Sequence, residues 1–401
     1  MRILWVKGGK LLPVDTGGKI RSFNIARRLA EKNDFTLLSY YDGRPDAAYE
    51  AAIAERFPNP RTICTGAPEG GMRQVLDYLR RLPLPAPYAV TKFTHPDVQH
   101  TISKWFDEGR FDVAVCDFLS ASLNFPEHRR VPCVLFQHNV ETVLWQRLFA
   151  TEADPLRKLS YRVEVSKMAK YEKAALRRFQ HIVAVSQRDR DEMMKFAPGC
   201  PVTIVPTGVD TEKYLRVPSA TADPPRIIFT GSMDWEPNID AVQYFCDQIW
   251  PAVVSNFPDA KFQIVGRNPH PSVQRLQSES VEVAGTVPSV IDYLRVATIV
   301  VVPLRIGGGT RLKIYEAMAM GKAVVSTSIG AEGLDIVPGR DLLIADSPEL
   351  FSSSIVHLLR ERKLREAIET AAACVAIQYD WSRVAAEFEN VLREAMASFC
   401  T

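Results

Sequence analysis

The sequence predicts an α/β protein built from two doubly wound domains that face each other across a cleft. Short apolar runs alternate with helix-patterned segments along the chain, which favours parallel sheets covered on both faces. A polar stretch with prolines, residues 216–225, interrupts this alternation, which then begins again. The length of 401 residues and the 46% hydrophobic content also suit two domains, because single domains usually contain about 100–200 residues.

The first half, residues 1–215, is predicted to form one domain. It opens with the buried strand RILWV and the helix GGKIRSFNIARRLAEKND, which carries Ile20, Phe23 and Ala26 on one side. Further strands are FTLLSYY, VAVCDFL, CVLFQHN and HIVAVS, and the longest helical segment is RKLSYRVEVSKMAKYEKAALRRF. No G-x-G-x-x-G follows the first strand, which argues against a nicotinamide dehydrogenase.

The second half, residues 216–380, repeats the pattern. RIIFTGS predicts a strand and AVQYFCDQIWPAVVSNF a helix. The strands KFQIVG, VEVAG, TIVVVPL, AVVSTS and LLIAD follow, and the helix KIYEAMAMG ends at Gly321. Two domains of the same architecture are therefore expected.

Charge and composition narrow the classes of partner. The net charge of +2 gives no overall field for nucleic acid, so an anionic ligand needs a local cluster of cations. The start of the sequence, MRILWVKGGK, does not have the pattern of a signal peptide, and no run approaches the roughly 20 apolar residues of a membrane span. We expect a cytoplasmic protein and leave peripheral contact with the inner membrane face open.

The stretch PLRIGGGTRLKIYEAMAMGKAVVST, residues 303–327, predicts an anion cradle. A strand end, a glycine-rich turn and a helix start meet here, so free N–H groups and a positive helix dipole point toward one place. Glu316 on this helix suits the hydroxyls of a ribose, so the stretch fits a ribose diphosphate. The alternative is a glycine turn with a solvated basic helix in which Glu316 pairs with Lys313. The residues expected at the ligand are Arg305, Gly307, Gly308, Gly309, Thr310, Arg311, Lys313 and Glu316.

Three other strand ends carry candidate residues. Gly17 and Gly18 open the first helix and favour phosphate, although they also suit an ordinary helix start. FQHNVE places His138, with Asn139 and Glu141, at the end of a strand, where ligand crevices lie in such sheets. A structural histidine is the alternative there. TGSMDWEPN places Gly231 and Trp235 after the first strand of the second domain, either as ligand contacts or as loop and helix cap only.

In their order and spacing these segments resemble the retaining glycosyltransferases of family four. The resemblance extends over nearly the whole chain and also rests on VAVSQRD at 183–189, VPTGVDTEKY at 205–214, FQIVG at 262–266 and VEVAGTV at 281–287. It implies a GT-B fold of two Rossmann-like domains, with the donor mainly on the C-terminal domain and the acceptor mainly on the N-terminal one. YDWS at 379–382 resembles the start of the closing helix, 381–401, that returns to the N-terminal domain.

The resemblance also implies roles for individual residues. Glu316 matches the second glutamate of a paired motif and should hold the ribose, while the backbone of Gly18 should meet the diphosphate. His138 should contact the donor sugar, and Thr286 and Val287 belong to the segment that borders the nucleobase. Two departures stand out: the first motif glutamate is replaced by Gly308, and TGSMDWEPN lacks the Arg and Lys that many members carry in that loop. The cations Arg305, Arg311 and Lys313 are expected to supply the missing charge.

The expected activity is transfer of a sugar from a UDP- or GDP-type nucleotide sugar to an acceptor hydroxyl, with retention of configuration. We expect no cofactor and no metal, because the sequence lacks a D-x-D triplet suited to one in the donor loop. His138, Arg305, Lys313 and Glu316 are the expected catalytic groups, with Asn139 and Glu141 on the acceptor side. The acceptor, whether a glycan, a lipid-linked sugar or a small molecule, is not readable, nor is the oligomeric state. A GT-B epimerase and a non-catalytic nucleotide-sugar binding protein remain alternatives.

Overall fold

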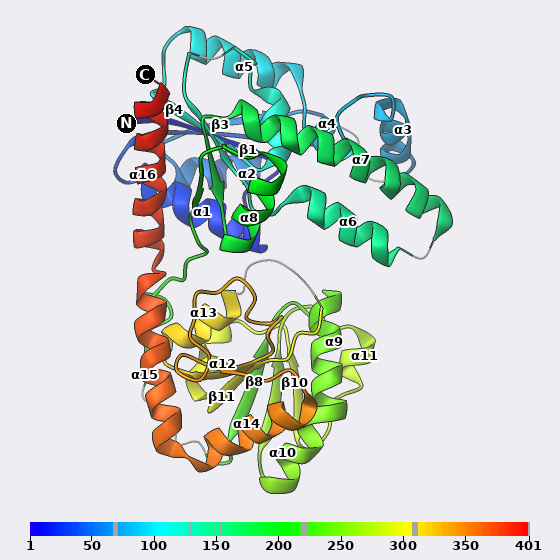
Figure 1. The fold of residues 1–401 in the computed structure, drawn as a ribbon, viewed down its shortest axis with the longest axis vertical. Helices are drawn as coiled ribbons and strands as arrows, with labels where there is room; N and C mark the ends of the chain where they lie inside the picture. Colours follow the sequence, from blue (N-terminus) through cyan, green and yellow to red (C-terminus); the bar gives the residue numbers. More distant parts are fainter. Residues whose placement is uncertain (67–70, 129, 153, 218–222, 307–311, 400–401) are drawn as a thin grey trace. The chain divides into compact units, whose positions relative to one another are not determined.

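The computed structural model describes residues 1–66, 71–128, 130–152, 154–217, 223–306 and 312–399 (Figure 1). The chain forms two compact units. Unit 1 contains Met1–Pro206 together with Val384–Thr401, and unit 2 contains Thr207–Arg383. Each unit is described by itself below.

Unit 1 is built on a parallel sheet in which β1 pairs with both β2 and β4. In the described part of the chain the strand order is β3-β2-β1-β4-β5-β6-β7. Its strands are β1 (Arg2–Gly8), β2 (Asp34–Tyr41), β3 (Asn59–Cys64), β4 (Val113–Asp117), β5 (Cys133–Phe136), β6 (His181–Ala184) and β7 (Val202–Ile204). β1, β4, β5 and β6 are buried along almost their whole length, which explains their continuous apolar sequences.

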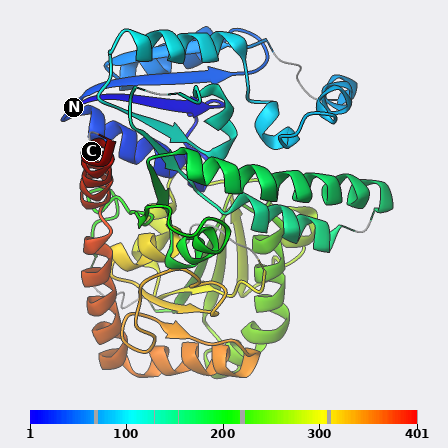
Figure 2. The same cartoon turned by 45° about the horizontal axis from the view of Figure 1, so that its top comes forward.

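Helices cover the sheet of unit 1 (Figures 1 and 2). They are α1 (Gly17–Ala30), α2 (Ala47–Arg56), α3 (Gly71–Arg81), α4 (Tyr88–Thr91), α5 (Pro96–Asp107), the 3-10 turn η1 (Leu119–Asn124), α6 (Glu141–Thr151), α7 (Pro155–Arg178), α8 (Gln187–Phe196) and α16 (Trp381–Phe399). In both views α6 and α7 extend away from the sheet, with α3 beside them. The predicted long charged helix is α7.

Unit 2 repeats this architecture with strand order β10-β9-β8-β11-β12-β13 among its described residues. The strands are β8 (Arg226–Thr230), β9 (Lys261–Val265), β10 (Val281–Gly285), β11 (Ile299–Val302), β12 (Ala323–Ser326) and β13 (Leu343–Ile344). The helices are α9 (Glu236–Tyr244), the π turn η2 (Phe245–Ile249), α10 (Trp250–Asn256), α11 (Pro271–Gln274), α12 (Val290–Val296), α13 (Leu312–Ala319), α14 (Pro348–Arg360) and α15 (Arg362–Gln378).

The strand order reverses beside the first strand of each sheet, between β1 and β4 and between β8 and β11. At such a point the connections leave toward opposite sides and open a crevice at the carboxyl ends of the strands. The expectation of two doubly wound sheets is confirmed. The loops after β1, β4, β5, β8 and β11 are therefore the places to examine for a site.

The structure corrects several local expectations. It adds two strands, β3 and β7, that the sequence pattern did not predict. Each lies at an edge of its sheet; β3 begins with polar residues and a proline and β7 has only three residues, so neither forms an apolar run. The inward side of α1 is only partly the expected one: Ala26 is buried, but Arg21, Ser22 and Ile25 are buried in place of Ile20 and Phe23, which are half-exposed. The helix expected over 241–257 is divided by the π turn η2.

The unit boundary lies between Pro206 and Thr207, whereas the sequence places the domain boundary after residue 215. The segment from Thr207 belongs to unit 2, because Val209 is buried in its core and donates a backbone hydrogen bond to the Tyr379 carbonyl at 2.8 Å. At the other end α16 begins at Trp381, and its Phe388 packs on Trp5 of unit 1 with ring centroids 5.4 Å apart. None of the described helices is long and apolar enough to cross a membrane.

Candidate functional site

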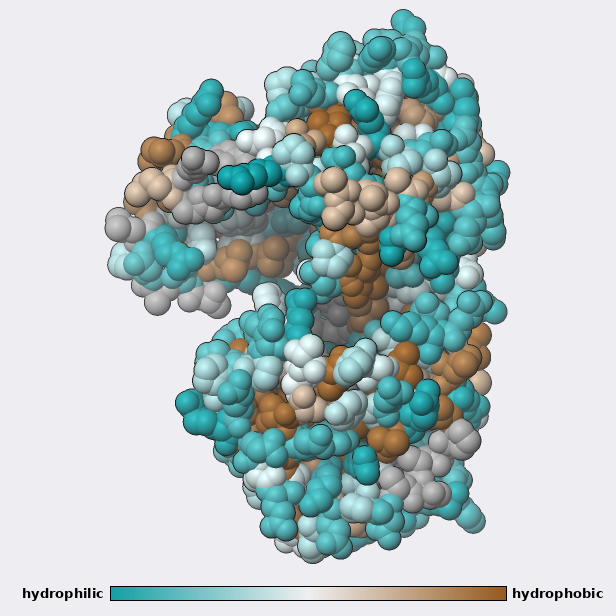
Figure 3. All heavy atoms as spheres, turned by 180° about the vertical axis from the view of Figure 1, so that it is seen from behind, coloured by the Kyte–Doolittle hydropathy of each residue, from teal (hydrophilic) through white to brown (hydrophobic). Residues whose placement is uncertain are grey.

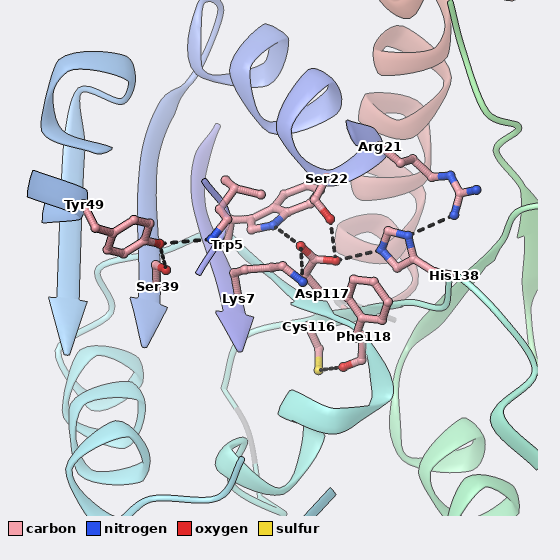
Figure 4. Close-up of polar contacts among 11 residues, drawn as sticks. Trp5, Lys7, Arg21, Ser22, Ser39, Tyr49, Cys116, Asp117, Phe118 and His138 are labelled. Atoms are coloured by element: carbon pink, nitrogen blue, oxygen red, sulfur yellow. Dashed lines mark hydrogen bonds and ion pairs between the residues drawn. The ribbon is translucent and has the colours of Figure 1, made fainter. Parts of the chain in front are cut away.

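A buried polar cluster lies at the carboxyl ends of β1, β4 and β5 in unit 1 (Figure 4). Its centre is Asp117, which ends β4 and is fully buried. The carboxylate accepts hydrogen bonds from Trp5 Nε1 at 3.0 Å, from Ser22 Oγ at 3.0 Å and from His138 Nε2 at 2.8 Å. Lys7 Nζ lies 3.9 Å from it and supplies the opposite charge. Lys7 and Asp117 thus form a buried ion pair at the strand reversal.

The hydrogen bonds of His138 fix its tautomer. Arg21 Nη1 lies 2.9 Å from His138 Nδ1, and a guanidinium can only donate, so Nδ1 accepts. The proton therefore sits on Nε2, which donates to Asp117 Oδ1. Burial lowers the pKa of His138 to about 3, against the opposing effect of Asp117, so the ring is neutral at pH 7.

The predicted contact between His138 and a donor sugar stays a prediction. Both ring nitrogens already bond to protein groups, and the ring is stacked on Phe118 with centroids 3.7 Å apart. A sugar hydroxyl would have to replace Arg21 or Asp117 to bond the imidazole. In this structure His138 therefore serves first to hold Arg21 and Asp117 in place.

Gly17 and Gly18 begin α1 beside this cluster. The preceding Thr16 has an extended backbone and its side chain makes no capping hydrogen bond to the helix. A Cβ on Gly18 would lie 2.6 Å from Cζ of Phe118, so packing alone requires glycine there. The half-exposed first turn is open to an anion in the way expected, but that role remains a prediction.

Glu141 and Asn139 follow β5 at the start of α6. The N-terminus of α6 is capped by Glu172 of α7, whose carboxylate accepts from the backbone N–H of Glu141 at 2.9 Å and of Thr142 at 2.8 Å. Burial, reinforced by the charge of Glu172, raises the pKa of Glu141 to about 7. A half-buried carboxyl that titrates near neutrality can accept or donate a proton. Asn139 is half-buried beside it.

In unit 2 a lysine lies against the glycine at the end of β8. Lys313, on α13, donates from Nζ to Asn238 Oδ1 at 2.9 Å and lies 4.0 Å above the Phe229 ring. A Cβ on Gly231 would lie 2.8 Å from this ammonium, so the lysine can occupy this position only because residue 231 has no side chain. The start of α9 follows directly, which adds the positive end of a helix dipole.

Glu316 lies one turn further along α13. Its Oε1 accepts a hydrogen bond from the Tyr214 hydroxyl at 2.8 Å, which orients the carboxylate. Burial raises the pKa of Glu316, while Tyr214 and the nearby Lys213 and Lys313 act in the opposite direction. The expected alternative pairing of Glu316 with Lys313 is not seen, because Lys313 bonds Asn238 instead.

The remaining candidates of unit 2 are dispersed. Arg305 forms an ion pair with Asp240 of α9, with Nε 3.0 Å from Oδ2, and lies over the Tyr244 ring. Its charge is thereby largely compensated. Trp235 is exposed at the start of α9, so its ring is accessible. Thr286 is exposed after β10, and Val287 packs against the core of unit 2.

Gly307, Gly308, Gly309, Thr310 and Arg311 lie outside the described residues, so the predicted glycine cradle is neither placed nor rejected. Within units the structure joins His138 to Gly18 through Phe118, and Lys313 to Gly231. Across the described residues no group of three or more His, Cys, Asp or Glu side chains is arranged to hold a metal ion.

Sequence reasoning missed several residues that shape these places. Asp117 is the clearest: it ends the apolar run VAVCD, and a charge at a strand's carboxyl end beside the order reversal was a readable signal. Arg267 is another. It follows β9 and donates from Nε to Ser232 Oγ at 2.7 Å, so it brings a cation to the loop TGSMDWEPN, which has none of its own. Others are Glu172, whose charge adds to burial in raising the pKa of Glu141, and Tyr214, which orients the carboxylate of Glu316.

Two doubly wound parallel sheets in one chain, each with its strand order reversing beside the first strand, define an architecture of GT-B type. Two family descriptions match the chain: "Glycosyltransferase Family 4" over residues 16–213 and "Glycosyl transferases group 1" over residues 224–361. The chain belongs to the group 1 glycosyltransferases, and its N-terminal half matches the family four description.

Curated relatives match part of the chain. An uncharacterized 44.6 kDa protein in the cps region of Klebsiella pneumoniae is 24% identical over 64% of this chain and 66% of its own length. Phosphatidyl-myo-inositol mannosyltransferase of Mycobacterium tuberculosis is 27% identical over 54% of this chain and 60% of its own length. The chain thus spans about two thirds or less of these relatives.

Solved structures match over the full length and show the fold. Sucrose-phosphate synthase of Thermosynechococcus elongatus has a TM-score of 0.68 and 14% identity, with 99% of both chains covered. HepE of Anabaena in complex with UDP has a TM-score of 0.64 and 14% identity, with 98% of this chain and 100% of that chain covered. The predicted GT-B fold is confirmed.

Proposed function

We propose that the chain transfers a sugar from a nucleotide-diphosphate sugar of UDP or GDP type to an acceptor hydroxyl, with retention and without a metal. The observation that carries this proposal is the ammonium of Lys313 against Gly231, with the oriented carboxylate of Glu316 on the same helix. A cation and a hydroxyl-accepting carboxylate one turn apart suit a diphosphate and its ribose. Family membership and the UDP held by HepE support the same reading.

Cleavage of the sugar–phosphate bond develops negative charge on the leaving diphosphate. Lys313 and the N-terminal end of α9 are positioned to stabilise that charge, because fixed cations and dipoles need no reorganisation during the reaction. Glu316 would accept the ribose hydroxyls and fix the position of the diphosphate. Arg267, held by Ser232, would add positive charge at the same edge of the sheet, whereas the charge of Arg305 is largely compensated by Asp240.

Unit 1 supplies the acceptor side in this proposal. Glu141, with a pKa near 7, is the group best able to take up a proton from an acceptor hydroxyl. Neutral His138 keeps Arg21 and Asp117 ordered beside the glycine start of α1, where the diphosphate would meet the Gly18 backbone. The acceptor is a glycan, a lipid-linked sugar or a small molecule.

Binding of nucleotides tests the donor part of the proposal. We expect Lys313→Gln and Glu316→Gln to weaken binding of UDP or GDP, measured by calorimetric titration, by roughly ten- to a hundredfold. Loss of a charge-assisted contact is worth about 1.5–3 kcal/mol. Lys363→Gln on α15 and Glu349→Gln on α14 are matched controls, because both side chains are exposed on unit 2. Unchanged affinity in both site variants would refute the assignment.

Nucleotide release tests the transfer part. Release from the preferred nucleotide sugar should rise with one member of a panel of acceptors. Binding of the nucleotide sugar without release of the nucleotide under any condition would instead identify a nucleotide-sugar binding protein. This outcome is worth testing because Gly308 replaces the first glutamate of the paired motif. Isomerised donor without acceptor would identify an epimerase.

A further inference from the structure

The helix α3 turns its apolar side to solvent. Met72, Val75, Leu76 and Leu79 have exposed fractions of 74%, 52%, 60% and 54%. Their spacing of three or four residues places them in one stripe along the helix. Such a stripe normally packs on a core, and here it continues into the exposed Leu82 and Leu84 that follow the helix. Figure 3 shows hydrophobic side chains among hydrophilic ones on the surface of the molecule.

The polar side of α3 is the one that faces the protein. Asp77 accepts hydrogen bonds from Arg81 at 2.9 Å and from the Tyr88 hydroxyl at 3.2 Å, and Tyr78 packs edge-on against the ring of Tyr88. Arg81 also donates to the Thr91 carbonyl. The orientation of α3 is therefore set by specific polar contacts, and the outward apolar stripe is a consequence of them.

The neighbouring helix α7 presents positive charge beside this stripe. Lys167 of α7 donates from Nζ to the carbonyl of Leu82, which ties the two segments together. The acidic residues of α7 turn inward: Glu164 accepts from the Tyr88 N–H at 2.7 Å, and Glu172 caps α6. The charged side chains that α7 exposes, as far as the structure describes them, are all basic: Arg157, Lys158, Arg162, Lys170, Lys173 and Arg177.

Exposed apolar side chains also occur on α7 itself, at Leu159 with 61% and Val163 with 37% exposure. The surface made of α3 and the exposed side of α7 is called the docking surface below. Large exposed apolar patches mark interaction sites. A protein partner is the less suitable occupant, because interface cores are depleted in lysine and a second copy would oppose the same basic helix.

We infer that the docking surface binds an anionic lipid bilayer, with the stripe of α3 inserted at the headgroup level and the basic side chains of α7 against the lipid phosphates. Amphipathic helices with apolar and Lys/Arg-rich faces bind interfaces in this way. The inference concerns unit 1 alone and stands whether or not the chain transfers a sugar. Where it does, an acceptor carried by the bilayer would be within reach of the enzyme.

Vesicle sedimentation tests the inference. The full chain should pellet with vesicles of phosphatidylcholine containing about a third phosphatidylglycerol and much less with phosphatidylcholine alone, and salt should weaken the binding. We expect Val75→Ser with Leu76→Ser and Leu79→Ser to reduce binding at least tenfold. Lys170→Glu with Lys173→Glu should do the same by removing attraction to the lipid phosphates.

The controls carry equivalent changes on unit 2. Leu350→Ser replaces a leucine of the same 60% exposure as Leu76, and Lys363→Glu reverses an exposed charge on α15. Both should bind vesicles as the wild type does. Failure of the wild type to pellet with the anionic vesicles would overturn the inference, as would undiminished binding by the serine variant. A dimer that the serine variant separates, seen by light scattering, would also overturn it, because the stripe would then be covered by a second copy.

Discussion

At the scale of single residues, unit 1 holds a neutral histidine between a cation and an anion. Arg21 donates to Nδ1 of His138 and Asp117 accepts from Nε2, so the ring links the two buried charges without carrying one itself. Protonation would add a positive charge beside those of Arg21 and Lys7 and remove the acceptor that Arg21 needs. This is why burial outweighs the attraction of Asp117 and the pKa of the ring falls to about 3.

This arrangement predicts a pH dependence of stability. The unfolded state takes up a proton at His138 below its ordinary pKa of 6.5, whereas the folded state does so only near 3. The contribution of neutral His138 to the free energy of unfolding is therefore fully present above pH 6.5 and is lost as the pH falls toward 3. Between those values we expect His138→Gln to reduce the slope of unfolding free energy against pH by about 1.4 kcal/mol per pH unit. Urea unfolding at several pH values measures it.

Glu141 makes the comparison between variant and wild type necessary. The pKa of Glu141 is raised to about 7 in the folded state. Its contribution to the free energy of unfolding is therefore present at low pH and is lost as the pH rises from 4.5 through 7. In the wild type this opposes the effect of His138 over the shared range. The exposed histidine His357 supplies the control, and His357→Gln should keep the wild-type slope. Equal slopes for His138→Gln and the wild type would contradict the buried neutral ring.

Sequence patterns predicted some residues of this buried cluster and missed others, for a physical reason. Strand ends can be read from hydrophobic runs, so His138 and Gly18 were singled out. Which side chain lies beside which depends on the packing of β1, β4 and α1, three segments far apart in sequence. The burial of Arg21 could not be predicted from the pattern of its helix, because the partners that make that burial tolerable, His138 and Asp117, come from other segments.

At the scale of elements, α1 and the end of β4 fit together through Gly18 and Phe118. Phe118 has a φ of 75°, unusual for a residue with a side chain. Its ring is held between the ammonium of Lys7, 3.9 Å from the ring centroid, and the imidazole of His138. α1 can approach this stack only because Gly18 has no Cβ, since one would lie 2.6 Å from the ring.

We therefore expect Gly18→Ala to lower the free energy of unfolding by about 1–3 kcal/mol, the usual cost of overpacking a fixed core. Urea denaturation gives the value. Phe118→Leu in the same background should relieve the clash, so the double variant should lose less than the sum of the two single losses. Additive losses would show that α1 shifts away from Phe118 and that the close contact does not constrain it.

The elements that sequence patterns failed to predict share a place in the sheet. Central strands such as β4 and β5 are covered on both faces and are apolar throughout, so they were predicted. The edge strands β3 and β7 are half-exposed, and nothing in NPRTIC or VTI distinguishes them from a loop. Their strand character comes from pairing with β2 and β6, a tertiary contact that local sequence does not encode.

At the scale of the whole molecule, the chain passes from unit 1 to unit 2 after Pro206 and returns after Arg383. Unit 1 is therefore completed by residues that follow unit 2 along the chain. The returning segment contributes to its interior as well as to its surface: Phe388 is fully buried, with its ring centroid 5.4 Å from Trp5 and 5.0 Å from Phe136. The sheet of unit 1 thus depends on a helix nearly two hundred positions beyond its last strand.

This dependence predicts a loss of stability confined to one unit. Phe388→Ala should cost unit 1 about 3–5 kcal/mol, as truncation of a buried aromatic side chain does. Hydrogen exchange should become faster in peptides from β1 and β5 and stay unchanged in peptides from β8 and β11, because Phe388 belongs to unit 1 and its ring packs on Trp5 and Phe136. Ile377→Ala, which shortens an exposed side chain on α15, should alter neither set. Faster exchange in both units after Phe388→Ala would mean that the two cores unfold together, and the division at Arg383 would then have no energetic counterpart.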